Sequence, residues 1–173
     1  MSEFDFSTLV TDRTQSDVTA LKKLLSKPYS SWTEEEKAQF SLASSKGAYN
    51  YTDLDRVSTA IYALDEMLRS FGYKTGVEKV PVPHGQYEGY DDYTWYETDV
   101  PASETMGKYL ENLSKLRSVI IAPASTPAIP SDMDGLTVTE ANNIEKIIAD
   151  LNQLLINMSL AWFYSGELYA GEV

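Results

Sequence analysis

The stretch KGAYNYTDLDRV, Lys46–Val57, joins a glycine to the first apolar positions of a predicted helix. Thr52 is a good N-cap, and Asp55 lies three residues further on, at the spacing of a capping box. Gly47 is a natural end for a preceding helix. The stretch is interpreted as a helix–corner–helix motif, and the short corner predicts that the two helices pack as neighbours. The motif comprises Gly47, Tyr49, Asn50, Tyr51, Thr52 and Asp55.

The corner itself carries two tyrosines and an asparagine. Asn50 tolerates the left-handed geometry of a tight corner, and Tyr49 and Tyr51 can bury their rings while their hydroxyl groups find partners. An architectural corner is therefore the favoured interpretation. The alternative is a recognition surface in which the same three side chains face a binding partner.

Helical periodicity extends along the chain on both sides of the corner. Val57, Ile61, Leu64 and Leu68 recur at intervals of 4, 3 and 4 residues, which places them on one face of a helix. The other predicted helices run from Thr14 until Pro28, from Thr33 to Gly47, from Pro101 or Ser103 to Ile121, and from Thr139 to at least Met158. Thr14, with Asp17 three residues on, Thr33 and Thr139 are the residues expected to cap three of these helices. Residues 52–68 align without gaps with residues 139–155, either through an internal duplication or because amphipathic helices look alike.

The segment between the third and fourth helices is different in character. VEKVPVP alternates like a strand but contains two prolines, so it predicts at best an edge strand, and the following residues are rich in glycine, aromatics and acids. The expected fold class is mainly α, a bundle of about five helices with an irregular or short β excursion near residues 77–98. We expect one helical domain, 1–173, with an aromatic and acidic loop at about 74–100 and a C-terminal arm at about 164–173.

Composition narrows the possible functions. The 173 residues carry a net charge of -12, which disfavours binding to nucleic acid and to anionic membranes. Up to Gly72 there are 8 basic and 11 acidic residues, and from Tyr73 onward 6 and 15, so the acidity lies mostly in the second part. There is no cysteine, which excludes disulfides, thiolate nucleophiles and cysteine-based zinc sites. No signal peptide or membrane helix is expected.

Candidate chemistry is sparse, and we expect no catalytic, cofactor-binding or metal-binding residue. His84 is the one histidine, in a turn-like PVPHG context without an evident orienting partner. The acids of residues 91–99 do not follow the spacing of a calcium loop. The candidate partner-binding residues are aromatic: Tyr87, Tyr90, Tyr93, Trp95 and Tyr96 in the loop, with Tyr164 and Tyr169 in the arm. The loop aromatics are interpreted mainly as side chains that pin the loop to the bundle, with a protein interface and a glycan site as alternatives.

Several strings in the chain are specific enough to suggest a family. They are TDRTQSDV from Thr11, SWTEEEK from Ser31, KGAYNYTDLDRV from Lys46, TWYETDVPASETMGKYLENLSKLRSV from Thr94, LTVTEANNIEKIIADL from Leu136 and YSGELYAGE from Tyr164. Together they resemble a pattern in virion structural proteins of Firmicute phages and prophages, of the tail and baseplate kind. The chain departs from that pattern at Asp55, where the family pattern has asparagine.

The resemblance implies a non-enzymatic virion structural or assembly protein, present in the virion and assembled in the bacterial cytoplasm. Its implied partners are other virion proteins, and the symmetry of particles favours a homo-oligomer. The alternative function is a host receptor or glycan-binding module that uses the aromatic loop, residues 87–96. Neither function involves a cofactor, nucleic acid or a membrane.

Overall fold

The computed structural model describes residues 4–41, 45–85 and 89–167, and within those ranges every regular element is a helix. The mainly α fold class is thus confirmed. Of the two alternatives for residues 77–98, irregular or short β, the described part is irregular and contains no strand. Pro81 and Pro83 lack the N–H groups that a ladder needs, and Val82 makes one cross-loop bond, to the Asp92 carbonyl at 2.8 Å. The helices are α1 (Gln15–Leu25), α2 (Glu34–Ser41), α3 (Tyr51–Ser70), α4 (Ser103–Val119) and α5 (Val138–Glu167), with short 3-10 turns η1 (Phe6–Thr8) and η2 (Tyr29–Ser31).

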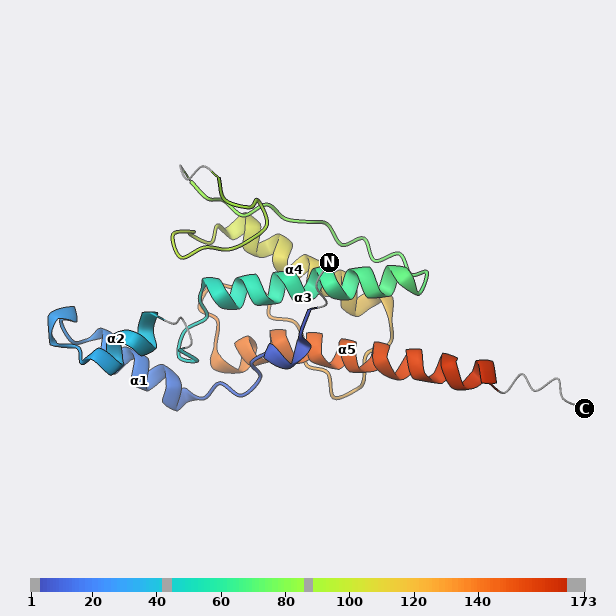
Figure 1. The fold of residues 1–173 in the computed structure, drawn as a ribbon, viewed down its shortest axis with the longest axis horizontal. Coiled ribbons are helices and arrows are strands. Elements are labelled where there is room, and N and C mark those ends of the chain that lie inside the picture. The colour runs from blue at the N-terminus through green and yellow to red at the C-terminus, as the bar shows by residue number, and fades with distance from the viewer. Residues whose placement is uncertain (1–3, 42–44, 86–88, 168–173) are drawn as a thin grey trace, which may run out of the picture.

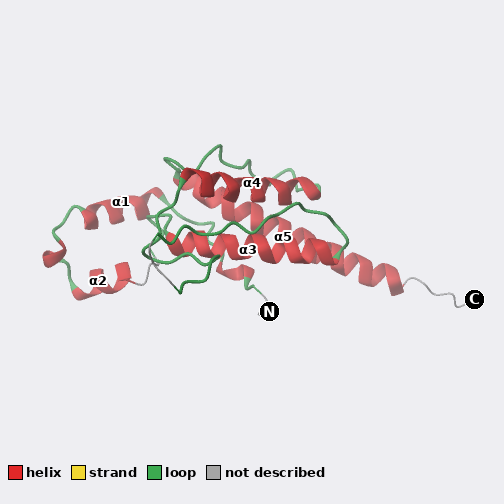
Figure 2. Ribbon diagram, turned by 90° about the horizontal axis from the view of Figure 1, so that it is seen from above, coloured by secondary structure: helices red, strands yellow, loops and turns green. Residues whose placement is uncertain are grey.

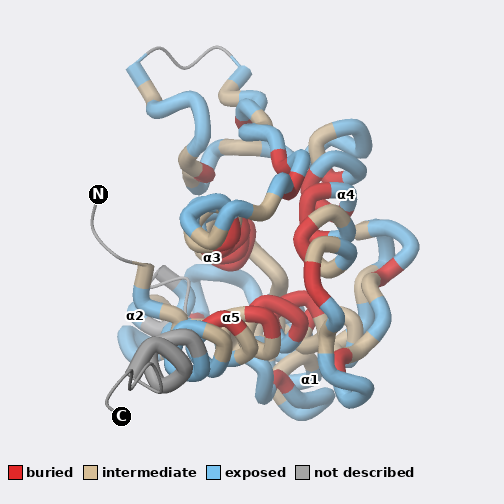
Figure 3. The backbone as a smooth tube through the Cα atoms, turned by 90° about the vertical axis from the view of Figure 1, so that its right-hand side faces the viewer, coloured by how far each residue is buried: buried red, intermediate tan, exposed pale blue. Residues whose placement is uncertain are grey.

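The core is a bundle of α3, α4 and α5, which run in the same direction and contact one another pairwise (Figure 1). Their buried faces turn toward a common interior (Figure 3). Leu64 and Leu68 of α3, Leu113 and Leu116 of α4, and five residues of α5 are almost completely buried. The five residues of α5 are Ile144, Ile147, Ile148, Leu151 and Leu155.

A parallel arrangement explains why the connections are long. A helix of 20 residues, the length of α3, is about 30 Å long, so the chain must travel back that distance before the next parallel helix can begin. Residues 71–102 and 120–137 make these two return crossings (Figures 1 and 2). The aromatic loop is therefore the first return crossing of a parallel bundle.

The start of α3 differs from the sequence-based expectation. Asn50, not Thr52, is the N-cap: its side chain accepts the N–H of Thr52 at 2.8 Å, and the Asp53 carboxylate accepts the N–H of Asn50 at 2.9 Å. The Thr52 hydroxyl itself donates to the Asn50 side chain. The sequence contains two overlapping boxes of equal spacing, Asn50 with Asp53 and Thr52 with Asp55. The earlier one is used, which leaves Asp55 free for a long-range contact.

The start of α5 shows the same shift of two residues. The Glu140 N–H donates to the Thr137 hydroxyl at 3.2 Å, and the Thr137 N–H donates to Glu140 at 2.9 Å, so the expected cap at Thr139 is also wrong. The expected caps of α1 and α2 are confirmed, because Thr14 pairs with Asp17 and Thr33 pairs with Glu36 in the same way.

Helices α1 and α2 form a separate pair at the end where α3, α4 and α5 begin (Figures 1 and 2). Because α2 lies beside α1 rather than along α3, the expected packing of the second helix on the third is wrong. Gly47 is not the end of α2, which is described to Ser41. A Cβ atom at Gly47 would lie 2.4 Å from the Asp17 carbonyl oxygen, so the glycine allows the corner to approach the backbone of α1.

The C-terminal arm also differs from expectation. Helix α5 continues to Glu167 and extends past the ends of α3 and α4 (Figure 1), so Tyr164 belongs to a helix and not to an extended arm. Tyr169 and the remainder of the predicted arm lie outside the described residues. Within the described ranges, none of the helices combines the length and the apolar character that crossing a bilayer requires.

Replacing Asn50 by alanine should lower the free energy of unfolding by about 1 kcal/mol, because an amide in the first turn of α3 loses its acceptor. Thr52→Ala should cost less, since the Thr52 backbone N–H keeps Asn50 as its acceptor. Urea denaturation of both variants tests this difference. A larger loss of stability in Thr52→Ala than in Asn50→Ala would show that Thr52 is the N-cap.

Candidate functional site

A buried cluster of charges lies where the N-terminal segment meets α3 and α5. Glu145 of α5 is fully buried and accepts hydrogen bonds from Arg13 at 2.6 Å, from Arg56 at 2.7 and 3.0 Å, and from the Val10 backbone N–H at 2.6 Å. Asp53 accepts a bond from Arg13 at 2.7 Å and pairs with Arg56 as well. Two guanidinium groups and two carboxylates thus form a neutral network.

The network keeps its two arginines charged inside the protein. Burial would lower the pKa of Arg13, but the nearby carboxylates of Glu145 and Asp53 outweigh that effect and raise it. Arg13 also donates to the Val10 carbonyl at 2.6 Å. Its Nε is buried and has no hydrogen-bond partner among the described residues. The charges are compensated by one another, so the cluster has little capacity left for an external ligand.

This network joins three of the strings that suggested the family. Arg13 comes from TDRTQSDV, Asp53 and Arg56 come from KGAYNYTDLDRV, and Glu145 comes from LTVTEANNIEKIIADL. The side chain of Asn142, in the same string as Glu145, bonds to both backbone groups of Arg13. It accepts the Arg13 N–H at 3.0 Å and donates to the Arg13 carbonyl at 2.9 Å. The strings therefore specify how segments distant in sequence are held together.

The tyrosines of the corner belong to the same region. The Tyr49 hydroxyl lies 2.7 Å from the Tyr109 hydroxyl of α4, and the Arg13 guanidinium lies 5.3 Å from the centre of the Tyr49 ring. Burial raises the pKa of both tyrosines well above the usual value. Tyr51 packs against the core, and Asn50 is the helix cap. These contacts support an architectural corner.

Within the aromatic loop, Trp95 and Tyr93 have different environments. Trp95 is 4% exposed and belongs to the bundle core, and its backbone N–H donates to Asp55 of α3 at 3.1 Å. Burial raises the pKa of Asp55, and the bond from Trp95 opposes this. Tyr93 is 37% exposed, with the Lys79 ammonium 5.2 Å from its ring centre. Trp95 thus docks the loop, while Tyr93 remains accessible.

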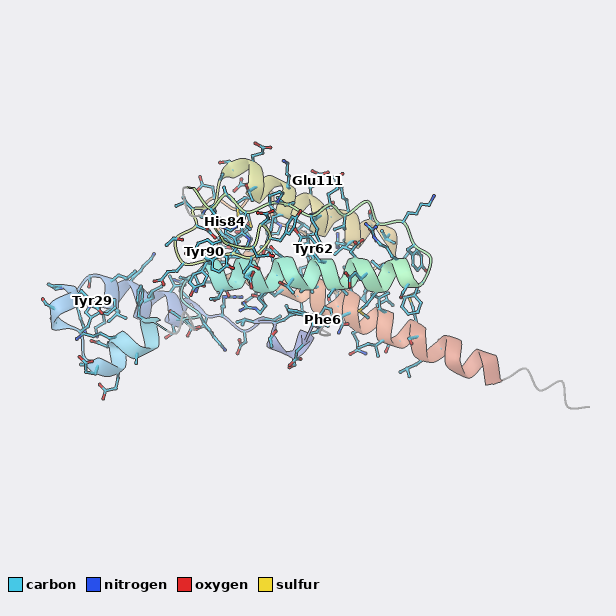
Figure 4. The ribbon with its side chains drawn as sticks, turned by 45° about the horizontal axis from the view of Figure 1, so that its top comes forward. Phe6, Tyr29, Tyr62, His84, Tyr90 and Glu111 are labelled. Atoms are coloured by element: carbon cyan, nitrogen blue, oxygen red, sulfur yellow. The ribbon has the colours of Figure 1, made fainter. Side chains whose placement is uncertain are left out.

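Tyr90 and Tyr96 lie beside the histidine, and Figure 4 shows His84 next to Tyr90. Tyr90 and Tyr96 stack with ring centres 4.0 Å apart, and His84 meets both of them edge-on, at 5.5 and 5.7 Å. Tyr87 lies outside the described residues. The structure thus brings Tyr90 and Tyr96 together, away from Trp95 in the core.

His84 has the orienting partner that the sequence did not reveal. Its Nδ1 lies 2.9 Å from Asp99, whose side chain is buried, and its Nε2 lies 2.9 Å from the Asp91 carbonyl. Partial burial disfavours the imidazolium, but these two acceptors outweigh it and raise the pKa of His84 above its usual value. The pair spans 15 residues, so no local spacing pointed to it.

The acids of the loop bind its own backbone. Asp91 accepts the N–H of Tyr93 at 3.0 Å, and Asp99 accepts the N–H of Tyr96 at 2.6 Å. Among the residues that the structure describes, no group of three or more metal-ligating side chains is placed to share an ion. These contacts tie the loop to itself in the absence of a β ladder.

A cleft of about 710 Å³ opens where α3 and α4 begin, beside the second return crossing. Its lining includes Tyr49, Leu54 and Met106, with Asp132 and Asp134 from the crossing. Gly107 also lines it, and a Cβ atom there would meet nothing within 4 Å. The lining mixes apolar surface with carboxylates and carries no catalytic constellation.

Comparison of the chain with protein-family models, with curated protein sequences and with solved structures gave no match.

Replacing Glu145 by glutamine should lower the free energy of unfolding by about 3–5 kcal/mol, because two buried arginines then share one carboxylate. The control is Glu111→Gln, which removes an exposed carboxylate paired with Lys115 and should change stability little. Chemical denaturation followed by circular dichroism measures both. Equal stability of the two variants would contradict a central role for the network.

Replacing Trp95 by alanine should cost about 3–5 kcal/mol, because a buried ring is lost from the core. Tyr93→Ala removes an exposed ring of the same loop and should melt close to the wild type. Calorimetry measures the melting temperature of both variants and so compares the loss of a buried ring with the loss of an exposed one. A Trp95→Ala variant that melts like the wild type would show that the loop is not anchored there.

The His84 pair predicts a pH-dependent loop. Because the folded pKa is raised, the pair's contribution to stability is complete below about pH 6.5 and is lost as pH rises through the folded pKa. Proton NMR can follow the titration directly, since the chain has 1 histidine. Asp99→Asn should lower the measured pKa of His84, and an unchanged titration would argue against the pair.

Proposed function

We propose that the chain is a non-enzymatic structural or assembly protein of a phage or prophage virion, of the tail or baseplate region, acting through protein–protein contacts. The observation that carries the proposal is the convergence of the family-like strings on one network around Glu145. Sequence strings whose residues meet in such a network specify the scaffold of the protein. It is therefore the scaffold, and not a reactive site, that the chain has in common with those virion proteins.

The described surface supports a role in assembly. Large apolar side chains are exposed at both ends of the long axis, where a particle subunit would meet its neighbours. At one end they belong to α1, η2 and α2, and at the other to the projecting part of α5. These residues are Leu25, Tyr29, Phe40, Ile156 and Leu160.

The proposed partners are other virion proteins and further copies of the chain. With a net charge of -12, the chain repels nucleic-acid backbones, so contacts with protein are the consistent choice. Assembly would take place in the bacterial cytoplasm, and the mature location would be the virion.

One observation favours a host receptor or glycan-binding role as the second candidate. Tyr93 is accessible beside Lys79, and Tyr90 and Tyr96 form a stacked pair in the same loop. Trp95 is buried, so a sugar ring would have to stack on the tyrosines. Loss of polysaccharide binding in Tyr93→Ala, with unchanged melting, would favour this function.

The test of the proposed function is to induce the bacterial strain that encodes the chain and to purify particles by density gradient. Mass spectrometry should find the chain in the particle fraction at a fixed ratio to the other virion proteins. Deleting its reading frame should leave incomplete particles, and supplying the chain from a plasmid should restore them. Complete particles that lack the chain would overturn the proposal.

A further inference from the structure

The segment from Thr14 to Ser41, here called the hairpin, comprises α1, η2 and α2 and stands apart from the bundle (Figure 2). Helix α1 is amphipathic, with Val18, Leu21 and Leu24 recurring at intervals of 3 residues, yet it contains no buried residue. An amphipathic helix normally buries its apolar stripe against a neighbour. Val18, Leu21 and Leu24 are each only partly buried, so the adjoining corner and α2 cover this stripe incompletely.

The interior of the hairpin is too small to cover its apolar side chains. Trp32 is the one buried side chain described in it, and it packs with Tyr29 and Phe40 at ring-centre distances of 5.1 and 5.2 Å. A cleft of about 460 Å³ remains open between α1 and α2, lined by Leu21, Leu24 and Phe40 among others. The two helices have 11 and 8 residues, lengths at which isolated helices are marginal in water.

The exposed apolar groups lie along this open side and at the tip. Leu25 is 54% exposed, Tyr29 is 65% exposed and Phe40 is 45% exposed. Tyr29 lies at the far end of the hairpin, away from the bundle (Figure 4). The hairpin thus presents an apolar surface that the described part of its own chain leaves uncovered.

The charges of the hairpin divide between its two helices. Helix α1 is basic toward its end, where Lys22 and Lys23 are exposed and form no ion pair with any described residue. Helix α2 begins with Glu34, Glu35 and Glu36. Glu36 pairs with Lys27 and Glu34 pairs with Lys37, both within the hairpin, whereas Glu35 has no ion pair among the described residues. A rotated copy of the hairpin would therefore place Lys22 and Lys23 of one α1 near Glu35 of the other copy's α2.

We propose that the hairpin is the dimerisation surface of this protein and that its occupant is the hairpin of a second copy. A two-fold axis would place α1 of one copy against α2 of the other, closing both clefts into one four-helix core. A two-fold contact uses the same patch on both subunits, which the charge pattern satisfies. Antiparallel helix pairs that share a core in this way form a four-helix bundle.

The inference names the partner in the proposed assembly function and in that sense rests on it. The end of α5 is a second helical surface with exposed apolar side chains, with Ile156 41% exposed and Leu160 51% exposed. Lys146 is the last basic residue of the chain, so the part of α5 that follows it has no basic side chain to complement its acids. A self-complementary charge pattern is thus present in the hairpin and absent from the end of α5.

The first experiment compares two double variants with matched exposure. Leu25→Gln/Phe40→Gln alters the hairpin, and Ile156→Gln/Leu160→Gln alters the end of α5. Sedimentation equilibrium of the full chain should show a dimer for the wild type and for the α5 variant. The hairpin variant should dissociate at least 10-fold more readily, a change of about 1.4 kcal/mol. Circular dichroism of each variant confirms that the helices are retained.

The second experiment reverses the charges. Lys22→Glu/Lys23→Glu places acids opposite acids in its own dimer, and Glu34→Lys/Glu35→Lys places bases opposite bases. Each variant alone should be mostly monomeric, whereas an equimolar mixture should form a mixed dimer because both contacts then pair opposite charges. This rescue would show that the hairpins of two copies contact each other.

Three outcomes would overturn the inference. They are a wild-type monomer throughout the concentration range, a dimer that persists in the hairpin variant, and charge-reversed variants that do not rescue each other. A dimer lost only in the α5 variant would assign the interface to the end of α5 instead. None of these results touches the proposed virion function, which depends on whether the chain is found in purified particles.

Discussion

The structure depends on how the negative charge of one buried carboxylate, that of Glu145, is balanced by neighbouring arginines. Glu145 is fully buried in α5, and an ionised carboxylate in that position is costly unless it is paired and hydrogen-bonded. Arg13 and Arg56 meet that requirement from the N-terminal segment and from α3, and Asp53 balances the second positive charge. The apolar faces of the bundle would tolerate sliding, but this network allows one alignment of the three segments.

A second constraint comes from the parallel direction of the helices. Parallel helices need long return crossings, and these crossings have to be held without a ladder of backbone hydrogen bonds. Asp55 holds the first crossing through the Trp95 N–H, and Asn142 holds the N-terminal segment through the Arg13 backbone. Both residues are available because α3 and α5 begin two residues earlier than their second possible caps.

Helices α3 and α5 are built alike at their starts. Each helix begins with a capping box, and each then places a polar side chain five residues after the cap, where it pins another segment. Gapless alignment of the two helices already paired Asp55 with Asn142. Their parallel roles favour an internal duplication over the general likeness of amphipathic helices. The hairpin has no such counterpart, and its uncovered surface makes it the part of the chain suited to contact others.

The sequence by itself determined the five helices, two of their caps and the apolar stripes, because these follow from local spacing and from turn chemistry. It left open which of two overlapping capping boxes begins α3, since Asn50 and Thr52 serve equally well locally. The tertiary structure decided this: Asp53 has to reach Arg13, and Asp55 has to reach the Trp95 backbone. The pairing of His84 with Asp99 and the exposure of α1 were likewise invisible in the sequence. Both depend on how distant segments fold back, and no local periodicity encodes that.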